Sequence, residues 1–368
     1  MRAQIAKSSN SSIDAAIAEL KTTLGKGPWR SVLYFASVVY DQYALAAKMQ
    51  EAFSPADTFG CSSCGEIISG HVTKKSIVAM AFGEEDISDL NIQMVENANS
   101  EASVKKAFGN FERYFGVRMQ DMDHQKHVGL ILVDGMSGSE EGLMDRIGNW
   151  TNVTFIGGSA GDDLKFQKTW VYANGRAASG AAVLVIIKPV RGFDIIKTQS
   201  FCEGNRKLIA TKVDEANRAV VEFNGQNAVK VYAAAVNTTP DKAGNHFMSH
   251  PIGLMVNSEP YVRSPQRVVD GKLAFYCAVK EGMELSVLES TNIIEDTRNA
   301  IKQKLREHGG GSALINFNCI LRTLEMEQKG QTEAYGKLFA EIPTIGFSTY
   351  GEEYIGHINQ TATMLLLI

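Results

Sequence analysis

The sequence has no Lys/Arg-rich run and no long apolar run. Its formal net charge is −4 over 368 residues, and the longest apolar run, Ala181–Ile187, is far shorter than the ~18 residues that a membrane helix needs. The first ten residues also lack the apolar core of a signal peptide. These absences argue against binding to nucleic acid or to a membrane, and against secretion. They predict a cytoplasmic protein that binds small molecules or other proteins.

Cysteine is scarce as well. The five cysteines form an odd and scattered set, which fits reduced thiols better than a disulfide framework. Only Cys61 and Cys64 have the spacing of a redox or zinc motif, and a zinc site needs a second ligand pair, whereas Cys202, Cys277 and Cys319 stand alone. We therefore interpret Cys61 and Cys64 as small loop residues, with thiol or metal chemistry as the alternative.

What the sequence does contain is a segment that occurs twice. Gly60–His71 and Gly346–His357 match at six positions, all at one offset of 286 residues (346 − 60 and 357 − 71). A shorter echo, Gly157–Asp162, has one residue fewer before its final Gly-acid pair. Each copy follows an apolar run, so the chain is predicted to contain at least three related units. The first and last segments should then have the same backbone path.

The periodicity around these segments predicts an α/β fold of repeated β-α-β-β units with pseudo-symmetric Gly-x-Ser loops. Asn174-Gly175 predicts a hairpin between Trp170–Tyr172 and Ala181–Ile187. The length suggests two domains, and the repeat order breaks near residue 222, so the predicted domains are residues 1–222 and 223–368. The other predicted strands and helices of the three units are Ser31–Ser37, Tyr43–Phe53, Asp57–Gly60, Ser76–Phe82, Val128–Val133, Ser139–Trp150, Val153–Ile156, Ala313–Cys319, Gln331–Ala340, Thr344–Gly346 and Ala362–Ile368.

The Gly-x-Ser loops are candidate ligand-binding segments. Each follows a buried strand, and ligands of α/β sheets bind beyond the carboxyl ends of the strands. Glycine lets the backbone come close to a ligand, while hydroxyl and carboxylate groups supply donors and acceptors. The alternative is that the loops are tight turns whose acids bond the local backbone. The candidate side chains are Ser62, Glu66, Ser159, Asp162, Ser348 and Glu352.

A second candidate segment begins at Asp134, at the end of a predicted strand. Ser137 and Glu140 have the spacing of a capping box, so backbone N–H groups at this helix start should be available to an anion. A zwitterion would suit the segment, with its carboxylate on the N–H groups and its ammonium group on Asp134. Ser139 completes the candidate set, and the segment is expected to border one cleft with Gly157–Asp162. The alternative is a structural cap with a solvated aspartate.

Gly157–Gly161 also matches the Gly-x-Ser-x-Gly elbow of serine hydrolases. That motif needs a helix directly after the serine, whereas Asp162–Tyr172 has no helical apolar stripe and leads into a strand. We therefore predict that the chain is not an enzyme. A serine- or thiol-dependent hydrolase that uses the loop around Ser159 is the alternative.

Two histidines, His246 and His250, lie in a methionine-bearing loop. The chain has no Cys-x-x-Cys-His sequence for covalent haem, but a non-covalent haem needs only an axial side chain and an apolar pocket. His250 is the first candidate axial ligand because Pro251 restrains the backbone beside it. His246 is the second candidate, followed by His71 or His357.

Eight segments taken together carry a family resemblance: Gly60–Ile67, Asp134–Glu141, Gly157–Asp163, Asn174–Arg176, Val262–Arg263, Glu281–Gly282, Asn318–Arg322 and Gly346–Glu352. They resemble the bacterial FIST family of sensory proteins, whose FIST N-terminal and FIST-C domains would cover nearly the whole chain. The resemblance implies a signal-input module that binds small ligands such as amino acids. One branch of the family senses nitric oxide with haem and regulates a partner histidine kinase of a two-component system.

The resemblance has one departure and one further implication. Cys64 stands where the family loop usually has alanine or a similar small residue. The chain carries no kinase, cyclase or chemoreceptor domain, which implies that it signals through a separate partner such as a histidine kinase.

Overall fold

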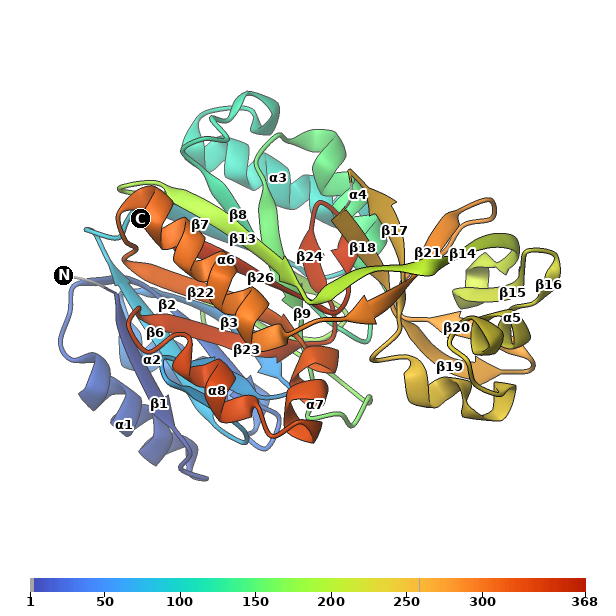
Figure 1. Ribbon diagram of the computed structural model, residues 1–368. Coiled ribbons are helices and arrows are strands. Elements are labelled where there is room, and N and C mark those ends of the chain that lie inside the picture. The colour runs from blue at the N-terminus through green and yellow to red at the C-terminus, as the bar shows by residue number, and fades with distance from the viewer. Residues whose placement is uncertain (1–2, 258) are drawn as a thin grey trace. The chain divides into compact units, whose positions relative to one another are not determined.

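Three copies of one element order build the larger of two structural units (Figure 1). The computed structural model describes residues 3–257 and 259–368. The larger unit comprises Met1–Thr198, Thr297–His357 and Ala362–Ile368, and the second unit comprises Gln199–Asp296 and Ile358–Thr361. The predicted α/β class is confirmed. The domain boundary near residue 222 stays a prediction, because the compact units do not divide the chain at a single point.

Each copy has the order β-α-β-α-β-β-β-β, with one additional short helix in the third copy. The first copy consists of β1 (Gln4–Ser8), α1 (Ile13–Leu24), β2 (Trp29–Ser37), α2 (Gln42–Phe53), β3 (Asp57–Ser63), β4 (Glu66–Ile68), β5 (His71–Thr73) and β6 (Ile77–Gly83). The second consists of β7 (Ile87–Val95), α3 (Glu101–Phe115), β8 (Val128–Val133), α4 (Glu140–Trp150), β9 (Phe155–Ser159), β10 (Val171–Ala173), β11 (Arg176–Ala178) and β12 (Ala182–Pro189). The third consists of β13 (Phe193–Gln199), α6 (Ile293–His308), β22 (Ala313–Cys319), α7 (Ile320–Gln328), α8 (Thr332–Lys337), β23 (Thr344–Thr349), β24 (Glu352–Tyr354), β25 (His357–Ile358) and β26 (Thr361–Leu367).

The three copies exchange short strand pairs in a closed cycle. The sheets have the orders β1-β6-β2-β3-β10-β11, β7-β12-β8-β9-β24-β25 and β13-β26-β22-β23-β4-β5. Each sheet therefore takes four strands from one copy and its last two from another copy. Because each pair completes the sheet of a different copy, the copies depend on one another for their backbone hydrogen bonds.

One glycine in each copy is required by close packing of two parallel strands. Gly60 pairs with Tyr34, and Gly157 pairs with Ile131, at the same place in β3 and β9. A Cβ atom added to either glycine would lie 1.7 Å from the carbonyl oxygen of its partner residue. At Gly346 the corresponding distance, to the carbonyl oxygen of Asn316, is 2.2 Å. The recurrence of these glycines therefore has a steric cause.

The predicted pseudo-symmetry is confirmed. β4 begins at Glu66 and β24 at Glu352, while β5 begins at His71 and β25 at His357, so both pairs of strands start 286 residues apart. In all three copies, the strand after the first helix pairs in parallel with the Gly-x-Ser strand and antiparallel with the last strand.

Three details of the sequence prediction are wrong. The Gly-x-Ser segments are the carboxyl ends of β3, β9 and β23 rather than loops. The Asn174-Gly175 turn joins β10 to β11, whereas Ala181–Ile187 contributes to β12, which pairs with β7 and β8. The predicted helix Gln331–Ala340 is only the short α8, and α7 precedes it.

One apolar core lies between the inner faces of the three sheets. It includes Phe35 of the first sheet, Leu130 and Ile156 of the second, and Phe317 and Phe347 of the third. Helices cover the outer faces: α1 and α2 pack on the first sheet, α3 and α4 on the second, and α6 and α8 lie over the third (Figure 1). The parallel strands of all three sheets thus pack around one common core.

The second unit is mainly β-sheet and interrupts the third copy between β13 and α6. Its strands have the order β18-β17-β21-β14-β15-β20-β19, with β16 paired to β15. Its elements are β14 (Phe201–Asp214), β15 (Ala219–Phe223), β16 (Gln226–Asn227), α5 (Ala228–Ala235), β17 (Ile252–Val256), β18 (Glu259–Arg263), β19 (Pro265–Val269), β20 (Lys272–Phe275) and β21 (Glu284–Ser290). No helix within residues 3–257 and 259–368 is long and apolar enough to cross a membrane.

Candidate functional site

The three equivalent serines at the strand ends have different surroundings. The Ser62 hydroxyl donates to the Gly161 carbonyl over 2.7 Å and accepts from the Trp170 amide over 3.0 Å. The Ser348 hydroxyl lies 2.8 Å from the hydroxyl of Thr323. These contacts tie Ser62 and Ser348 firmly into the fold.

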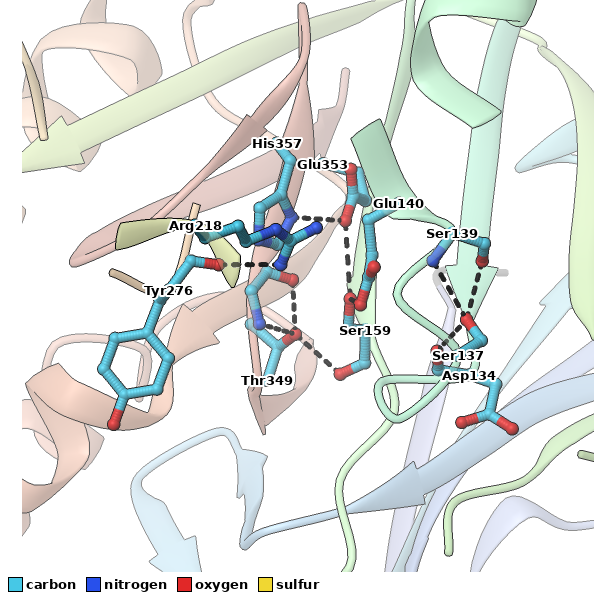
Figure 2. A network of polar contacts seen from close by, with 11 residues as sticks. Asp134, Ser137, Ser139, Glu140, Ser159, Arg218, Tyr276, Thr349, Glu353 and His357 are labelled. Atoms are coloured by element: carbon cyan, nitrogen blue, oxygen red, sulfur yellow. Dashed lines mark hydrogen bonds and ion pairs between the residues drawn. The ribbon is translucent and has the colours of Figure 1, made fainter. Parts of the chain in front are cut away.

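Among the described residues, the hydroxyl group of Ser159 makes only long contacts, to two carboxylates. Its hydroxyl lies 3.5 Å from Oε1 of Glu140, the first residue of α4, and 3.4 Å from Oε1 of Glu353 in β24. All three side chains are buried. Figure 2 shows them pointing toward one another from α4, β9 and β24. All three equivalent serines are buried, but Ser159 is the one whose hydroxyl lies between two carboxylates.

Glu353 occupies a position where the fold accepts an apolar residue. It pairs with Gly157, as Ile67 pairs with Gly346 in the equivalent strand pair, and both side chains are almost completely buried. In the remaining copy, Tyr172 pairs with Gly60. Since isoleucine and tyrosine fill the equivalent positions, the fold itself does not require a carboxylate here.

His357 is the ion-pair partner of Glu353. Its Nδ1 lies 2.9 Å from Glu353 Oε1, and the imidazole is buried, whereas the equivalent His71 is exposed. Burial raises the pKa of Glu353 to about 7 against the opposing effect of His357. Burial alone would lower the pKa of His357, but the carboxylates of Glu353 and Glu140 raise it to about 9. A Cβ atom at residue 351 would lie 2.1 Å from the His357 ring, so Gly351 makes room for the imidazole.

Two carboxylate oxygens of this group have no donor. Oε2 of Glu140 and Oε2 of Glu353 are buried and accept no hydrogen bond from any described residue. Leaving a buried acceptor unsatisfied costs about 1–3 kcal/mol, so such atoms point to a ligand or to a special role. We call Glu140, Ser159, Glu353 and His357 the Ser159 acid cluster.

The predicted capping box at α4 is wrong. The N-cap residue is Ser139, with no side-chain capping bond. The Ser137 hydroxyl instead donates to the Asp134 carbonyl and lies 2.6 Å from the Ser139 hydroxyl. Glu140 is the first helical residue and takes part in the Ser159 acid cluster, where the helix dipole favours its negative charge.

Asp134 organises the backbone around the end of β8. One carboxylate oxygen accepts from the Met136 amide over 2.8 Å and from the Thr169 hydroxyl. The other accepts from the Ser179 hydroxyl over 2.7 Å and from the Gly180 amide. A ligand ammonium group at Asp134 would compete with these four protein donors.

Asp162 and Glu66 are likewise surrounded by protein donors. Asp162 accepts from the amides of three residues that follow it and from the Tyr350 hydroxyl. Glu66 accepts from the hydroxyls of Ser63 and Ser76 and from the Ser76 amide. The two carboxylates therefore fix the chain after β9 and between β4 and β6.

Asp134 and Ser159 lie on neighbouring segments, while the cleft that the two segments were expected to border stays a prediction. The Ala160 amide donates to the Val133 carbonyl over 2.7 Å, and a Cβ atom on Gly135 would lie 2.2 Å from the Ala160 carbonyl oxygen. The ligand-binding roles of Asp134, Ser137, Ser139, Asp162, Ser62, Glu66, Ser348 and Glu352 stay predictions. Sequence reasoning missed Glu140 and Glu353 as site residues, although it named Glu140 as a cap and His357 as part of the repeat.

The hydrolase alternative finds no support at Ser159. The Ser159 amide donates to the Gly351 carbonyl over 2.8 Å, and the Ala160 amide is bonded to Val133, so the N–H groups that would form an oxyanion hole are already used. Glu353 rather than His357 faces the serine hydroxyl. For the thiol alternative, burial raises the pKa of Cys64 to about 11, which disfavours the reactive thiolate.

The candidate haem ligand His250 lies in the second unit, after the 3-10 turn Pro240–His246. Its Nδ1 is 2.9 Å from the Ser249 hydroxyl, and burial lowers the pKa of His250. Both features fit a neutral imidazole with Nε2 as the iron ligand. Haem binding at His250 or His246 stays a prediction.

A group of side chains with the spacing of metal ligands shares no residue with the Ser159 acid cluster and does not include His250. Among the described residues, Asp194, Glu307 and His308 form a group with suitable ligand distances. Lys304 places its ammonium group 2.9 Å from carboxylate oxygens of Asp194 and Glu307. The Lys304 ammonium group thus already offsets negative charge of Asp194 and Glu307.

The haem prediction can be tested by hemin titration. Purified chain should take up one equivalent of hemin and give a Soret band that shifts on reduction and again with nitric oxide. His250→Ala should change this spectrum, whereas His308→Ala, in the Lys304 group, should leave it unchanged. Absence of stoichiometric uptake by the wild type contradicts haem binding, and an unchanged His250→Ala spectrum contradicts the choice of ligand.

Two domain models match this chain. The model of the FIST N domain matches residues 30–226, and the model of the FIST C domain matches residues 228–354. An uncharacterized protein of the archaeon Methanocaldococcus jannaschii is 21% identical over 325 residues, which cover 82% of this chain. The matched region spans 61% of that relative's length.

Proposed function

This chain belongs to the FIST family of sensory, ligand-binding signalling domains, and on that premise we propose that it is a signal-input protein whose ligand binds at the Ser159 acid cluster. Transfer of the signal to a separate partner such as a histidine kinase is part of the same proposal and rests on the family alone.

The comparison of the three copies carries the proposal. The hydroxyl groups of Ser62 and Ser348 make well-formed hydrogen bonds within the protein, whereas the Ser159 hydroxyl has only contacts of 3.4 and 3.5 Å among the described residues. Glu353 places a carboxylate where an equivalent position has Ile67. Natural proteins break their own folding pattern mainly at functional sites. The second Gly-x-Ser segment is therefore the best candidate for ligand contact.

The neighbouring acids then act as positioning residues. Asp134 and Asp162 hold the chain on either side of Ser159 by bonds to four protein donors each. Such supporting hydrogen bonds fix the residues that contact a ligand. Their substitution should weaken binding through a loss of order rather than through a lost ligand contact.

Ser159→Ala tests the site. We expect a panel of amino acids and small amines, screened by thermal shift, to contain compounds that stabilise the wild type. Ser159→Ala should weaken the binding of such a compound by about two- to tenfold, because one hydrogen bond is worth about 0.5–1.5 kcal/mol. Isothermal titration calorimetry measures the change.

Ser62→Ala and Ser348→Ala are the matched controls. Both should lower the melting temperature, because they remove hydrogen bonds of the fold, but should leave the affinity within about twofold. If either control weakens binding as much as Ser159→Ala does, the ligand is not specific to the second segment.

A further inference from the structure

The two donor-less oxygens of the Ser159 acid cluster determine what a ligand must bring. Oε2 of Glu140 and Oε2 of Glu353 are both buried, and in the ionised carboxylates both can only accept hydrogen bonds. The Ser159 hydroxyl lies between the two carboxylates but has a single proton, so it can donate to one of them at a time. The cluster thus has more acceptors than donors, and a fitting ligand has to supply donors.

The charges of the cluster also indicate a ligand that donates hydrogen bonds. The charged groups that act most strongly on Glu353 are His357 from β25 and Glu140 from α4. With two ionised carboxylates and one imidazolium, these three groups carry a formal charge of −1. Glu141, the next residue of α4, also helps to raise the pKa of His357. A buried excess of negative charge is stabilised by a cation that donates hydrogen bonds.

We propose that the Ser159 acid cluster selects a ligand with a single positive charge and at least two N–H donors, such as a primary ammonium or guanidinium group. This inference rests on the proposed function, since it assigns the ligand class of the same site. One N–H group bonds Glu140 Oε2 and another bonds Glu353 Oε2, while the Ser159 hydroxyl oxygen accepts from a third N–H group and donates to one of the carboxylates. Asp134 is not the ammonium-binding residue in this arrangement, because its oxygens already accept four protein hydrogen bonds.

The arrangement makes binding sensitive to pH. The cation binds the ionised form of Glu353, whose pKa is about 7. Affinity should therefore fall as the pH drops below 7, where Glu353 becomes protonated and its negative charge is lost.

Three compounds of equal chain length separate the ligand classes. Isothermal titration of the full chain at pH 8 with n-butylammonium chloride, n-butanol and sodium butyrate should give binding for n-butylammonium that is about tenfold or more tighter than for the other two. Equal or tighter binding of butyrate or butanol overturns the cation assignment, as does the absence of n-butylammonium binding.

Variants locate the binding. Glu140→Gln and Glu353→Gln should each weaken n-butylammonium binding about tenfold or more, since charge-assisted hydrogen bonds are lost. Asp145→Asn removes an exposed charge from the same helix and should change the affinity less than twofold. Glu140→Gln leaves the Glu353–His357 pair intact, so it remains informative if Glu353→Gln folds poorly. Equal affinities for Glu140→Gln and Asp145→Asn would overturn the inference.

The same titrations distinguish the inference from the proposed function. If butyrate binds and Ser159→Ala weakens its binding, the sensory site stands and only the ligand class is wrong. If no compound that binds the chain responds to Ser159→Ala, the proposed site fails together with the inference.

Discussion

Replacing Gly157 with alanine is expected to destabilise the chain by more than about 4 kcal/mol, a large part of the stability of an ordinary domain. The added Cβ atom would lie 1.7 Å from the Ile131 carbonyl oxygen and 2.7 Å from its carbon. β8 cannot move away, because it is bonded to β9 on one side and to β12 on the other. Urea unfolding followed by circular dichroism measures the loss, and we expect little soluble, folded protein at 37 °C.

Gly148→Ala is the control for this substitution. Gly148 lies on the exposed face of α4, and no heavy atom is within 4 Å of an added Cβ atom. Alanine should stabilise the helix by up to about 1 kcal/mol. Gly60→Ala, which would meet the Tyr34 carbonyl oxygen at 1.7 Å, should behave like Gly157→Ala. A Gly157→Ala protein with the unfolding midpoint of the wild type would contradict the strand packing described above.

Replacing His357 alone should cost about 3–5 kcal/mol, whereas replacing it together with Glu353 should restore or exceed wild-type stability. His357→Leu leaves the buried Glu353 carboxylate without its ion-pair partner. The double variant Glu353→Ile/His357→Leu removes both charges, and Ile67 shows that an equivalent strand position accepts isoleucine. Hydrophobic replacement of a buried ion pair is often neutral or stabilising by about 1–4 kcal/mol.

The pH dependence of stability follows from the same pair. The pKa of His357 rises from 6.5 to about 9 on folding, so its contribution is fully present below pH 6.5 and is lost as the pH rises through 9. The pKa of Glu353 rises from 4.5 to about 7, so the folded state favours its protonated form, and stability falls as the pH rises from 4.5 to 7. The wild type is therefore more stable at the acid end of each pH range, which is 4.5 to about 7 for Glu353 and 6.5 to about 9 for His357.

Melting temperatures between pH 6 and pH 9.5 check this prediction. The wild type should lose stability toward pH 9.5, while the double variant should lack this part of the pH dependence. His71→Leu, at the exposed equivalent of His357, should change stability by less than about 0.5 kcal/mol. A double variant that melts below His357→Leu would contradict the assignment of the pair.

The sequence indicated the repeated part of the fold because the signals there are local. Apolar runs that end in Gly-x-Ser predict β3, β9 and β23. The offset of 286 residues relates β4 and β5 to β24 and β25. The exchange of strand pairs between copies could not be predicted, because pairing between strands far apart in the sequence leaves no local pattern. The sequence did not show that β13 and α6 belong to the third copy, since the second unit separates these two elements.

The candidate site was predicted only in part, because the sequence was searched for residues that recur between the copies. Reasoning from the repeat selected acids that recur, such as Glu66 and Glu352, and a recurring acid is one that the fold itself can use. Glu66 does hold local backbone and hydroxyl groups. The more informative signal was a difference between copies, Ile67 against Glu353, at the same offset. Burying a carboxylate at a strand position that is apolar in another copy costs free energy. The fold alone does not explain this cost.

Ligand binding by the Glu353→Ile/His357→Leu variant tests most directly whether the Ser159 acid cluster is the ligand site. A compound that stabilises the wild type in a thermal-shift titration, n-butylammonium or a compound from the amino-acid and amine panel, should stabilise His71→Leu to the same extent. It should have no effect on the double variant, although that protein is folded. An equal shift of the melting temperature in the double variant would show that the ligand binds elsewhere.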